Sequence, residues 1–305
     1  MSFDHLPLVS PGLTAFVFAG GGSLGAIEVG MLRELLERGV RADCVIGASA
    51  GAINAAYFAG RPDAEGVAEL ELLWCRIRRR DIMPLSMFGL FEMMLRRRSN
   101  LVEATALRIL LENNLPYERV EQATIPLHVV ATNMLSGNEV VLSSGPVVDA
   151  VLASAAIPGV FPPVRIDGVD LVDGGVANNT PISVAIGLGA TRIIVLPAGF
   201  ACALHKPPAN AIAQAIHALT LIIARQLVRD LAFYSSRAEI FVVPPLCPLD
   251  VSPYDYTQCD RLIERAAVQT RAWLSDGGLE RGAIPAQLHE HAHAEAVKQK
   301  GVRHQ

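Results

Sequence analysis

Hydrophobic positions near the start of the chain form short apolar runs that alternate with segments of helical spacing. The run TAFVFAG at 14–20 precedes a segment at 26–38 whose apolar residues recur at helical spacing and which ends at Gly39. A shorter run at 44–47 then leads into an Ala-rich segment that ends at Gly60. This pattern predicts strand, turn and helix twice in succession. Two consecutive βα units favour a parallel sheet with helices on its faces.

The same alternation continues along most of the remaining chain. It predicts strands at 126–133, 139–143, 192–197 and 239–243, a short apolar run at 169–172, and helices at 146–156, 211–235 and 255–274. No internal repeat and no Ser/Gly-rich linker interrupts the sequence, so we expect one α/β domain over residues 1–286. From about residue 287 the sequence HEHAHAEAVKQKGVRHQ offers no apolar face, and we expect a mobile tail at 287–305. Its histidines, His289, His291 and His293, are not pre-organised by anything in the sequence, so we expect no metal site there.

Composition supports a folded protein with a buried sheet. Of the 305 residues, 51% are hydrophobic and only 18% are charged, which indicates a globular chain and not a disordered one. The net charge of -4 and the pI of about 6.1 give no overall attraction to polyanions. A role in binding nucleic acid is therefore not expected.

The cysteines and the mean hydropathy indicate where in the cell the protein is expected. The five cysteines lack CxxC or metal-ligand spacing, and an odd number cannot all pair within one chain, so reduced thiols and a cytoplasmic protein are expected. The first residues lack the features of a signal peptide, and no stretch of 18 residues is uncharged and strongly apolar, which predicts no membrane span. The mean hydropathy of +0.35 nevertheless leaves room for a peripheral contact with lipid.

The sequence GASAG at 47–51 fits GxSxG between a predicted strand and a predicted helix. In that context a sharp turn projects a serine hydroxyl at the C-terminal edge of the sheet. Gly47 and Gly51 leave room for the turn, and a helix N-terminus at Ser49 would stabilise an anion that forms beside its oxygen. The motif predicts Ser49 as a nucleophile, with a plain Gly-rich helix start as the alternative.

A second Gly-rich segment, GGGSLG at 20–25, follows the first predicted strand. A P-loop would end in Lys and a hydroxyl residue, where this chain has Ala26 and Ile27. A dinucleotide turn expects an acidic residue about 20 positions later, but the second strand runs directly into GASAG. The remaining functional interpretation is an oxyanion hole formed by backbone N–H groups, chiefly those of Gly21 and Gly22.

A third Gly-marked segment, LVDGG at 171–175, places Asp173 at the end of a short apolar run. Gly174 and Gly175 allow the backbone to turn tightly and leave the carboxylate accessible. Because adjacent βα units bring their turns together at one edge of a parallel sheet, the nucleophile and the oxyanion turn should share one crevice. Asp173 is the predicted base.

In these blocks the sequence resembles the patatin-like phospholipase family. The segment AGGGSLGAIEVGML at 19–32 is similar to the family's oxyanion segment, GASAG to its nucleophile elbow, and VDGGVANNTP at 172–181 to its catalytic-aspartate loop. ASAAIPGVFPPV at 153–164 is similar to the stretch that precedes that loop. The blocks follow the family's order, and the resemblance covers residues 13–200.

The resemblance implies a three-layer α/β/α sandwich around a mostly parallel central sheet. It also implies hydrolysis of lipid or other acyl esters by a Ser49–Asp173 dyad, without cofactor or metal ion. The glycines of the motifs are Gly20, Gly21 and Gly22 for the oxyanion hole, supported by Gly25, Gly47, Gly51, Gly174 and Gly175. One departure stands out, because the family often has Lys or Arg where this chain has Leu24. Whatever that cation does for anion stabilisation or loop anchoring must come from elsewhere.

Three alternatives use the same residues differently. An ordinary α/β-hydrolase would need a histidine after Asp173, and neither His205 nor His217 lies in a recognisable motif. An acyltransferase would pass the same acyl group to an alcohol or a thiol. A catalytically idle lipid-binding or storage protein is disfavoured, because Ser49, Asp173 and the glycine run are all intact.

Arginines at 76–80 and 96–98 flank the apolar segment PLSMFGLFEMML at 84–95. One interpretation is an insertion at 76–98 that forms a lid or a peripheral membrane contact, with arginines near lipid phosphates. The other is a buried helix with solvated flanks, or an oligomer contact.

Overall fold

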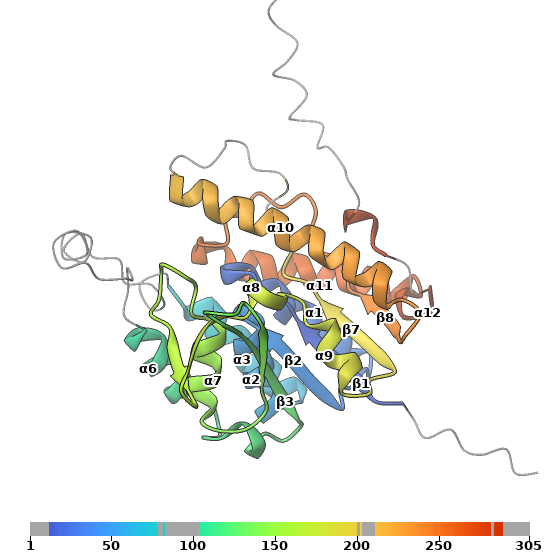
Figure 1. Cartoon of the computed structure of the whole chain (residues 1–305). Coiled ribbons are helices and arrows are strands. Elements are labelled where there is room, and N and C mark those ends of the chain that lie inside the picture. Colours follow the sequence, from blue (N-terminus) through green and yellow to red (C-terminus); the bar gives the residue numbers. More distant parts are fainter. Residues whose placement is uncertain are drawn as a thin grey trace, which may run out of the picture.

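The computed structural model centres on an eight-stranded mixed β-sheet within the part of the chain that it describes (Figure 1). The structure describes residues 12–78, 82, 104–199, 202, 211–281 and 284–288, without the side chains at 211–213, 215–217, 219 and 224. The strand order is β5-β6-β3-β2-β1-β7-β8, and β4 pairs with β3. The strands are β1 (Thr14–Phe18), β2 (Cys44–Ala48), β3 (Leu127–Asn133), β4 (Glu139–Leu142), β5 (Val164–Ile166), β6 (Val169–Asp173), β7 (Arg192–Leu196) and β8 (Glu239–Val242).

The strands that carry the Gly-rich turns are parallel neighbours. Strands β1, β2, β3, β7 and β8 run parallel, whereas β4 and β6 are antiparallel to β3, and β5 is antiparallel to β6. Because β1 lies directly beside β2, the turns after them share one edge of the sheet. The mostly parallel sheet is confirmed, and its antiparallel strands are a feature that the sequence pattern did not predict.

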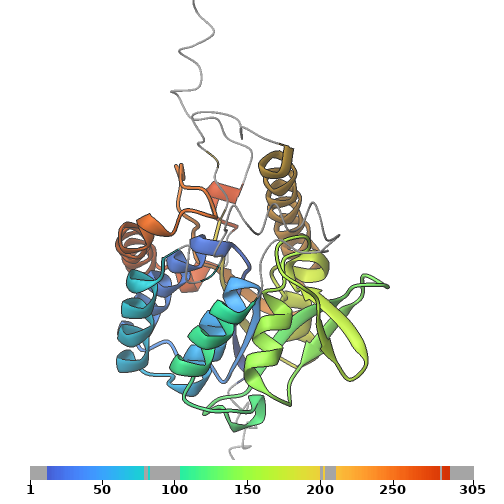
Figure 2. The ribbon, with the colours of Figure 1, turned by 90° about the vertical axis from the view of Figure 1, so that its left-hand side faces the viewer.

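Helices cover both faces of the sheet (Figures 1 and 2). Side chains of a strand point alternately to its two faces, and in β1 Phe16 and Phe18 pack on one face while Ala15 and Val17 pack on the other. The first face is covered by α1 (Ala26–Glu37), α2 (Ala50–Gly60), α3 (Ala64–Arg76), α7 (Val147–Ser154) and α11 (Cys259–Ser275), and the second by α9 (Ile182–Gly187) and α10 (Ala211–Tyr234). The predicted three-layer α/β/α sandwich is therefore confirmed.

Most predicted elements agree with the structure to within a few residues. The elements that were not predicted include the helices α3, α6 (Thr105–Asn114), α8 (Gly175–Asn178), α9 and α12 (Gly278–Arg281), and the strand β5. The helix predicted from residue 255 begins instead as a separate 3₁₀ turn, Tyr256–Gln258, and α11 follows it. The Asp255 carboxylate accepts the Thr257 N–H at 2.9 Å, and this local cap accounts for the separate turn.

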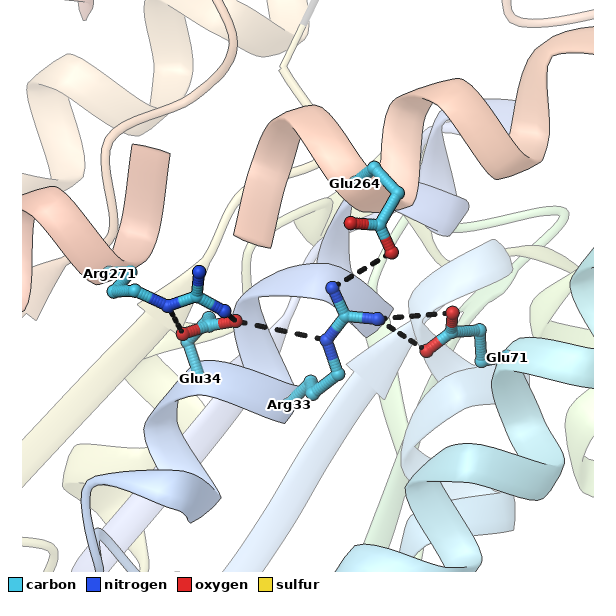
Figure 3. A network of polar contacts seen from close by, with 5 residues as sticks. All are labelled: Arg33, Glu34, Glu71, Glu264 and Arg271. Atoms are coloured by element: carbon cyan, nitrogen blue, oxygen red, sulfur yellow. Dashed lines mark hydrogen bonds and ion pairs between the residues drawn. The ribbon is translucent and has the colours of Figure 1, made fainter. Parts of the chain in front are cut away.

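A network of ion pairs joins α1 to α3 and α11 (Figure 3). The buried Glu34 carboxylate accepts two hydrogen bonds from Arg271 of α11, at 2.8 and 2.7 Å. Arg33 donates to Glu71 of α3 at 2.9 and 3.1 Å, and to Glu264 of α11 at 3.0 Å. The network fixes the helix that follows the first glycine turn against a helix near the other end of the chain.

Within the described residues, no helix combines the length and the apolar character needed to cross a membrane. The apolar segment at 84–95 and the predicted tail from residue 289 onward lie outside the described residues.

Candidate active site

Ser49 stands in a sharp turn between β2 and α2. Its backbone has φ 53° and ψ −124°, a conformation that residues with a side chain rarely adopt. Because α2 begins at Ala50, Ser49 occupies the N-cap position beside the free N–H groups of the first helical turn. An added Cβ at Gly51 would lie 2.5 Å from the Phe18 carbonyl oxygen, and one at Gly47 would overlap the Gly51 carbonyl. The turn therefore depends on glycine at both flanking positions.

Asp173 is the last residue of β6, and its carboxylate contacts Ser49. The Ser49 hydroxyl donates to Oδ2 at 2.6 Å, and the Gly175 N–H donates to Oδ1 at 2.7 Å. The two side chains are buried, with Ser49 8% and Asp173 7% exposed. Burial raises the pKa of Asp173 to about 6, while the hydrogen bonds from Ser49 and Gly175 act to lower it. This pKa suits a base that works near neutral pH.

The direct contact leaves no room for an imidazole between the serine and aspartate oxygens. His205 and the side chain of His217, which an ordinary triad would need, lie outside the described residues. The geometry of the dyad thus supports direct proton transfer between Ser49 and Asp173.

The end of α7 holds both members of the dyad in place. The hydroxyl of Ser154 accepts the Ser49 N–H at 2.9 Å and donates to the Val130 carbonyl at 2.5 Å. The Ala156 carbonyl accepts the Asp173 N–H at 2.9 Å. Ser154 is fully buried. The stretch around Ser154 is part of the family resemblance, but no separate motif indicated the role of this serine.

The glycine turn after β1 lies beside the nucleophile. An added Cβ at Gly20 would lie 3.0 Å from the Ser49 Cβ. The Gly20 N–H donates to the Asn179 carbonyl at 3.0 Å, and the Gly20 carbonyl accepts from Asn179 Nδ2 at 3.0 Å. Since this double contact engages the Gly20 N–H, the candidate oxyanion donors are the N–H groups of Gly21 and Gly22. Gly20 was predicted together with these two donors, but in the structure its N–H is engaged by Asn179. Asn179 was not predicted, although it lies in the VDGGVANNTP block.

Two further glycines of the motifs allow close packing around the site. An added Cβ at Gly25 would lie 3.1 Å from both the Ala50 Cβ and the Trp74 ring. At Gly174 it would overlap the Val130 carbonyl. Glycine at these two positions lets the start of α1 approach α2 and α3, and lets the segment after Asp173 approach β3.

The dyad and the glycine turn open into one pocket whose walls are mainly apolar. Its apolar and aromatic lining residues include Leu24, Ile53, Trp74, Ile82, Leu107, Ile157, Phe161, Val176, Ile223, Tyr254 and Tyr256. Trp74 and Leu107 come from helices that the sequence did not predict, and Tyr254 comes from the loop after β8. No motif surrounds these three residues, so their place in the pocket follows from the fold alone.

A family model for patatin-like phospholipases matches residues 16–186, which is more than half of the chain. The chain belongs to the patatin-like phospholipase family. An uncharacterized NTE family protein of Mycobacterium tuberculosis is 30% identical over 183 residues, covering 60% of this chain and 48% of that protein. Patatin-like phospholipase domain-containing protein 7 of Mus musculus is 30% identical over 189 residues, covering 61% of this chain and 13% of that protein. The alignments thus span less than half the length of these curated relatives.

Similarity to solved structures is weaker. Human GIVD cytosolic phospholipase A2 aligns with a TM-score of 0.49 at 9% identity, covering 89% of this chain and 62% of that chain. VipD from Legionella pneumophila aligns with a TM-score of 0.47 at 19% identity, covering 88% of this chain and 67% of that chain. These scores are too low to support an argument, and membership of the patatin-like family rests on the family model.

Leu24 stands where the patatin-like family often has Lys or Arg, and the structure accounts for the anchoring that such a cation would give. Leu24 is fully buried and lines the pocket. The turn is held instead by the two Asn179 hydrogen bonds to Gly20 and by the Ser23 N–H, which donates to the Pro253 carbonyl at 2.8 Å. Backbone and amide contacts therefore anchor this turn, and the pocket gains an apolar side chain.

Proposed function

We propose that this protein is a serine acyl hydrolase that cleaves carboxylic ester bonds in lipids through an acyl-enzyme on Ser49. The observation that carries the proposal is the 2.6 Å hydrogen bond from the Ser49 hydroxyl to the Asp173 carboxylate inside an apolar pocket. Membership of the patatin-like phospholipase family implies lipid acyl hydrolase activity.

In the proposed reaction Asp173 accepts the Ser49 proton as the serine oxygen attacks the ester carbonyl carbon. Because its pKa is about 6, Asp173 is ionised at neutral pH and is a stronger base than an ordinary aspartate. The N–H groups of Gly21 and Gly22 stabilise the negative charge on the carbonyl oxygen. Asp173 then protonates the departing alcohol, and in a second half-reaction it activates the water that releases the acid.

The walls of the pocket support an acyl chain as the part of the substrate that it holds. Side chains such as Leu24, Ile53 and Phe161 offer apolar surface beside the nucleophile. Each methylene buried against such surface contributes about 0.8 kcal/mol. We therefore propose an activity of the phospholipase A, lysophospholipase or esterase type.

We also propose that the insertion at 76–98 serves the pocket as a lid or a peripheral membrane contact. Ile82, which belongs to this insertion, lines the pocket. The apolar segment at 84–95 lies outside the described residues, so its contact with lipid stays a hypothesis.

Labelling with a fluorophosphonate, combined with an ester panel, tests the proposed function. Wild-type protein and Ser235→Ala, which removes an exposed hydroxyl at the end of α10, should both be labelled and active. Ser49→Ala should lose labelling, and its turnover should fall by about four orders of magnitude or more. The panel contains short aryl esters, phospholipids, lysophospholipids and triglycerides.

The other possible outcomes would each contradict the proposed function in a different way. Near-full turnover by Ser49→Ala would refute Ser49 as the nucleophile. Labelling accompanied by product formation only when an alcohol or thiol acceptor is added would indicate an acyltransferase. Absence of labelling in the wild type would indicate an idle lipid-binding protein.

A further inference from the structure

The loop after β8 returns to the glycine turn, although it lies beyond the residues at 16–186 that match the family model. The Pro253 carbonyl accepts the Ser23 N–H at 2.8 Å, and the Ser252 carbonyl accepts the Ser23 hydroxyl at 3.2 Å. The Pro253 carbonyl also lies against Gly22, where an added Cβ would overlap it. The loop is thereby fixed to the turn that carries the candidate oxyanion donors.

Tyr254 belongs to this loop and lines the same pocket as Ser49 and Asp173. Two residues later, the buried Tyr256 stacks on Trp74, with ring centroids 6.5 Å apart and an interplanar angle of 7°. On one side of Tyr254, Pro253 contacts the glycine turn. On the other side, Tyr256 packs against Trp74 of α3. The Tyr254 phenol therefore has a fixed place in the pocket wall.

The charge of Asp173 acts on Tyr254. Burial and, after it, the negative charge of Asp173 raise the pKa of the Tyr254 phenol to about 12. Since the hydroxyl stays protonated across the neutral range, it is available as a hydrogen-bond donor beside the dyad.

The proposed hydrolysis assigns hydrogen-bond donors to the carbonyl oxygen and makes Asp173 the group that protonates the departing alcohol oxygen, but it assigns no hydrogen-bond donor that stabilises the charge on that oxygen while its bond breaks. We propose that Tyr254 is a further catalytic residue, whose hydroxyl donates a hydrogen bond to the departing ester oxygen next to Asp173. This inference rests on the proposed function. In the step concerned, the bond from Ser49 to the acyl carbon has formed, and the acyl carbon–oxygen bond of the ester breaks with its electron pair on the departing oxygen. The proton that came from Ser49 moves from Asp173 to that oxygen, and Tyr254 keeps its own proton.

Tyr254→Phe tests this role with two esters of one acyl chain, an alkyl ester and a p-nitrophenyl ester. An alkoxide develops strong charge as it departs and needs a donor, whereas nitrophenoxide is stable without one. A hydrogen bond to a charged oxygen corresponds to about a tenfold to hundredfold change in rate. We expect kcat/KM, which reports acylation, to fall by that factor on the alkyl ester and by less than about threefold on the nitrophenyl ester.

Tyr256→Phe is the matched control, because it removes a second phenol hydroxyl from the same loop. Any effect that it has should be equal on the two esters, and thermal unfolding of both variants reports on their fold. Unchanged kinetics in a folded Tyr254→Phe, or equal losses on both esters, would overturn the role at the departing oxygen. Ser49→Ala in the same assay separates the two proposals, since an active Ser49→Ala would refute the function itself, and an inactive one beside an unaffected Tyr254→Phe would refute only the role of Tyr254.

Discussion

Asp173 is buried, yet it must be ionised to accept the proton of Ser49. Burial raises its pKa to about 6, so the reactive form is lost as the pH falls below that value. We expect kcat/KM on a soluble short-chain ester to be level above pH 6 and to fall about tenfold per pH unit below it. A pH profile from 4.5 to 8 measures this limb. An acid limb near pH 4, where an ordinary aspartate titrates, would show that Asp173 is not the group that controls the rate.

The same raised pKa lowers the stability of the folded protein above pH 6. Because the folded state holds the Asp173 proton more tightly than the unfolded state, the contribution is favourable below about pH 4 and is lost as the pH rises through 6. Once ionised, the buried carboxylate costs on the order of 3 kcal/mol. Asp173→Asn should therefore be inactive but more stable than wild type at pH 8, with a difference that shrinks toward pH 4. Denaturant unfolding at both pH values checks this, and a variant less stable at pH 8 would contradict it.

Among single residues, those that could be predicted from the sequence are flanked by glycines that a tight backbone turn requires. Gly51 is required because α2 passes close to the end of β1, and Gly47 because the first turn of α2 folds back over it. These two requirements leave a recognisable pattern around Ser49. The structure brings Ser49 and Asp173 together, as the motifs led us to expect. Tyr254 has no such signature, because its place in the pocket depends on a loop that is distant in the sequence from the glycine turn it contacts. Ser252 of that loop accepts the Ser23 hydroxyl across a separation of 229 residues.

At the scale of single elements, the end of α7 supports the candidate site, and Ser154 at this end provides a test. Removing the Ser154 hydroxyl would leave the Ser49 N–H and the Val130 carbonyl without their partner in a buried site. Such a loss costs about 1–3 kcal/mol of stability. Because the strained backbone of Ser49 would also be held less firmly, Ser154→Ala should lower kcat by about tenfold or more with little change in KM.

Steady-state kinetics on a soluble ester and thermal unfolding measure the two effects of Ser154→Ala. Ser235→Ala, which also removes a serine hydroxyl but on the exposed end of α10, serves as the control and should change neither. If Ser154→Ala lost stability while kcat stayed at the wild-type value, the serine would be structural and would not position the nucleophile.

Most of the predicted elements are apolar runs or segments whose apolar residues recur at helical spacing. Most of those that were missed are short or have a large polar face. α3 and α6, which place Trp74 and Leu107 in the pocket, each bury only one face. The start of α3 is marked by Asp63, whose carboxylate accepts the Gly66 N–H at 2.8 Å, and this helix-start signal was not used. The hairpin of β5 and β6 turns at Asp167 and Gly168, both at positive φ, and this Asp-Gly pair was a usable signal. The hairpin was not predicted because its two strands are short and the rest of the sequence pattern favours parallel strands.

At the scale of the whole molecule, the candidate active site depends on contacts with the part of the chain that follows β8. The loop that carries Pro253 and Tyr254 leads through the 3₁₀ turn Tyr256–Gln258 into α11. This helix packs against α1, which begins at the glycine turn. The ion pairs of Figure 3 join the same two helices through Glu34 and Arg271. No local pattern in the sequence specifies this contact, because it forms between segments more than 200 residues apart.

Gly30 of α1 lies close against the backbone of α11, and it offers a test of this coupling. In most helix interiors Gly→Ala stabilises by about 1 kcal/mol. At Gly30, however, the added Cβ would overlap the Ile263 carbonyl oxygen and lie 3.0 Å from the Ala267 backbone nitrogen. Both neighbours are backbone atoms of a helix, so α11 itself would have to move.

We therefore expect Gly30→Ala to destabilise the protein by about 1–3 kcal/mol, the usual cost of overpacking. It should also lower kcat/KM, because displacement of α11 shifts the loop of Tyr254 against the glycine turn. Gly187→Ala in α9 is the matched control, since among the described residues no atom lies within 4 Å of the added Cβ, and it should be neutral or slightly stabilising. Thermal unfolding and ester kinetics on both variants decide the matter. If Gly30→Ala were as stable and active as Gly187→Ala, α11 could move without disturbing the candidate active site, and the expected coupling would be wrong.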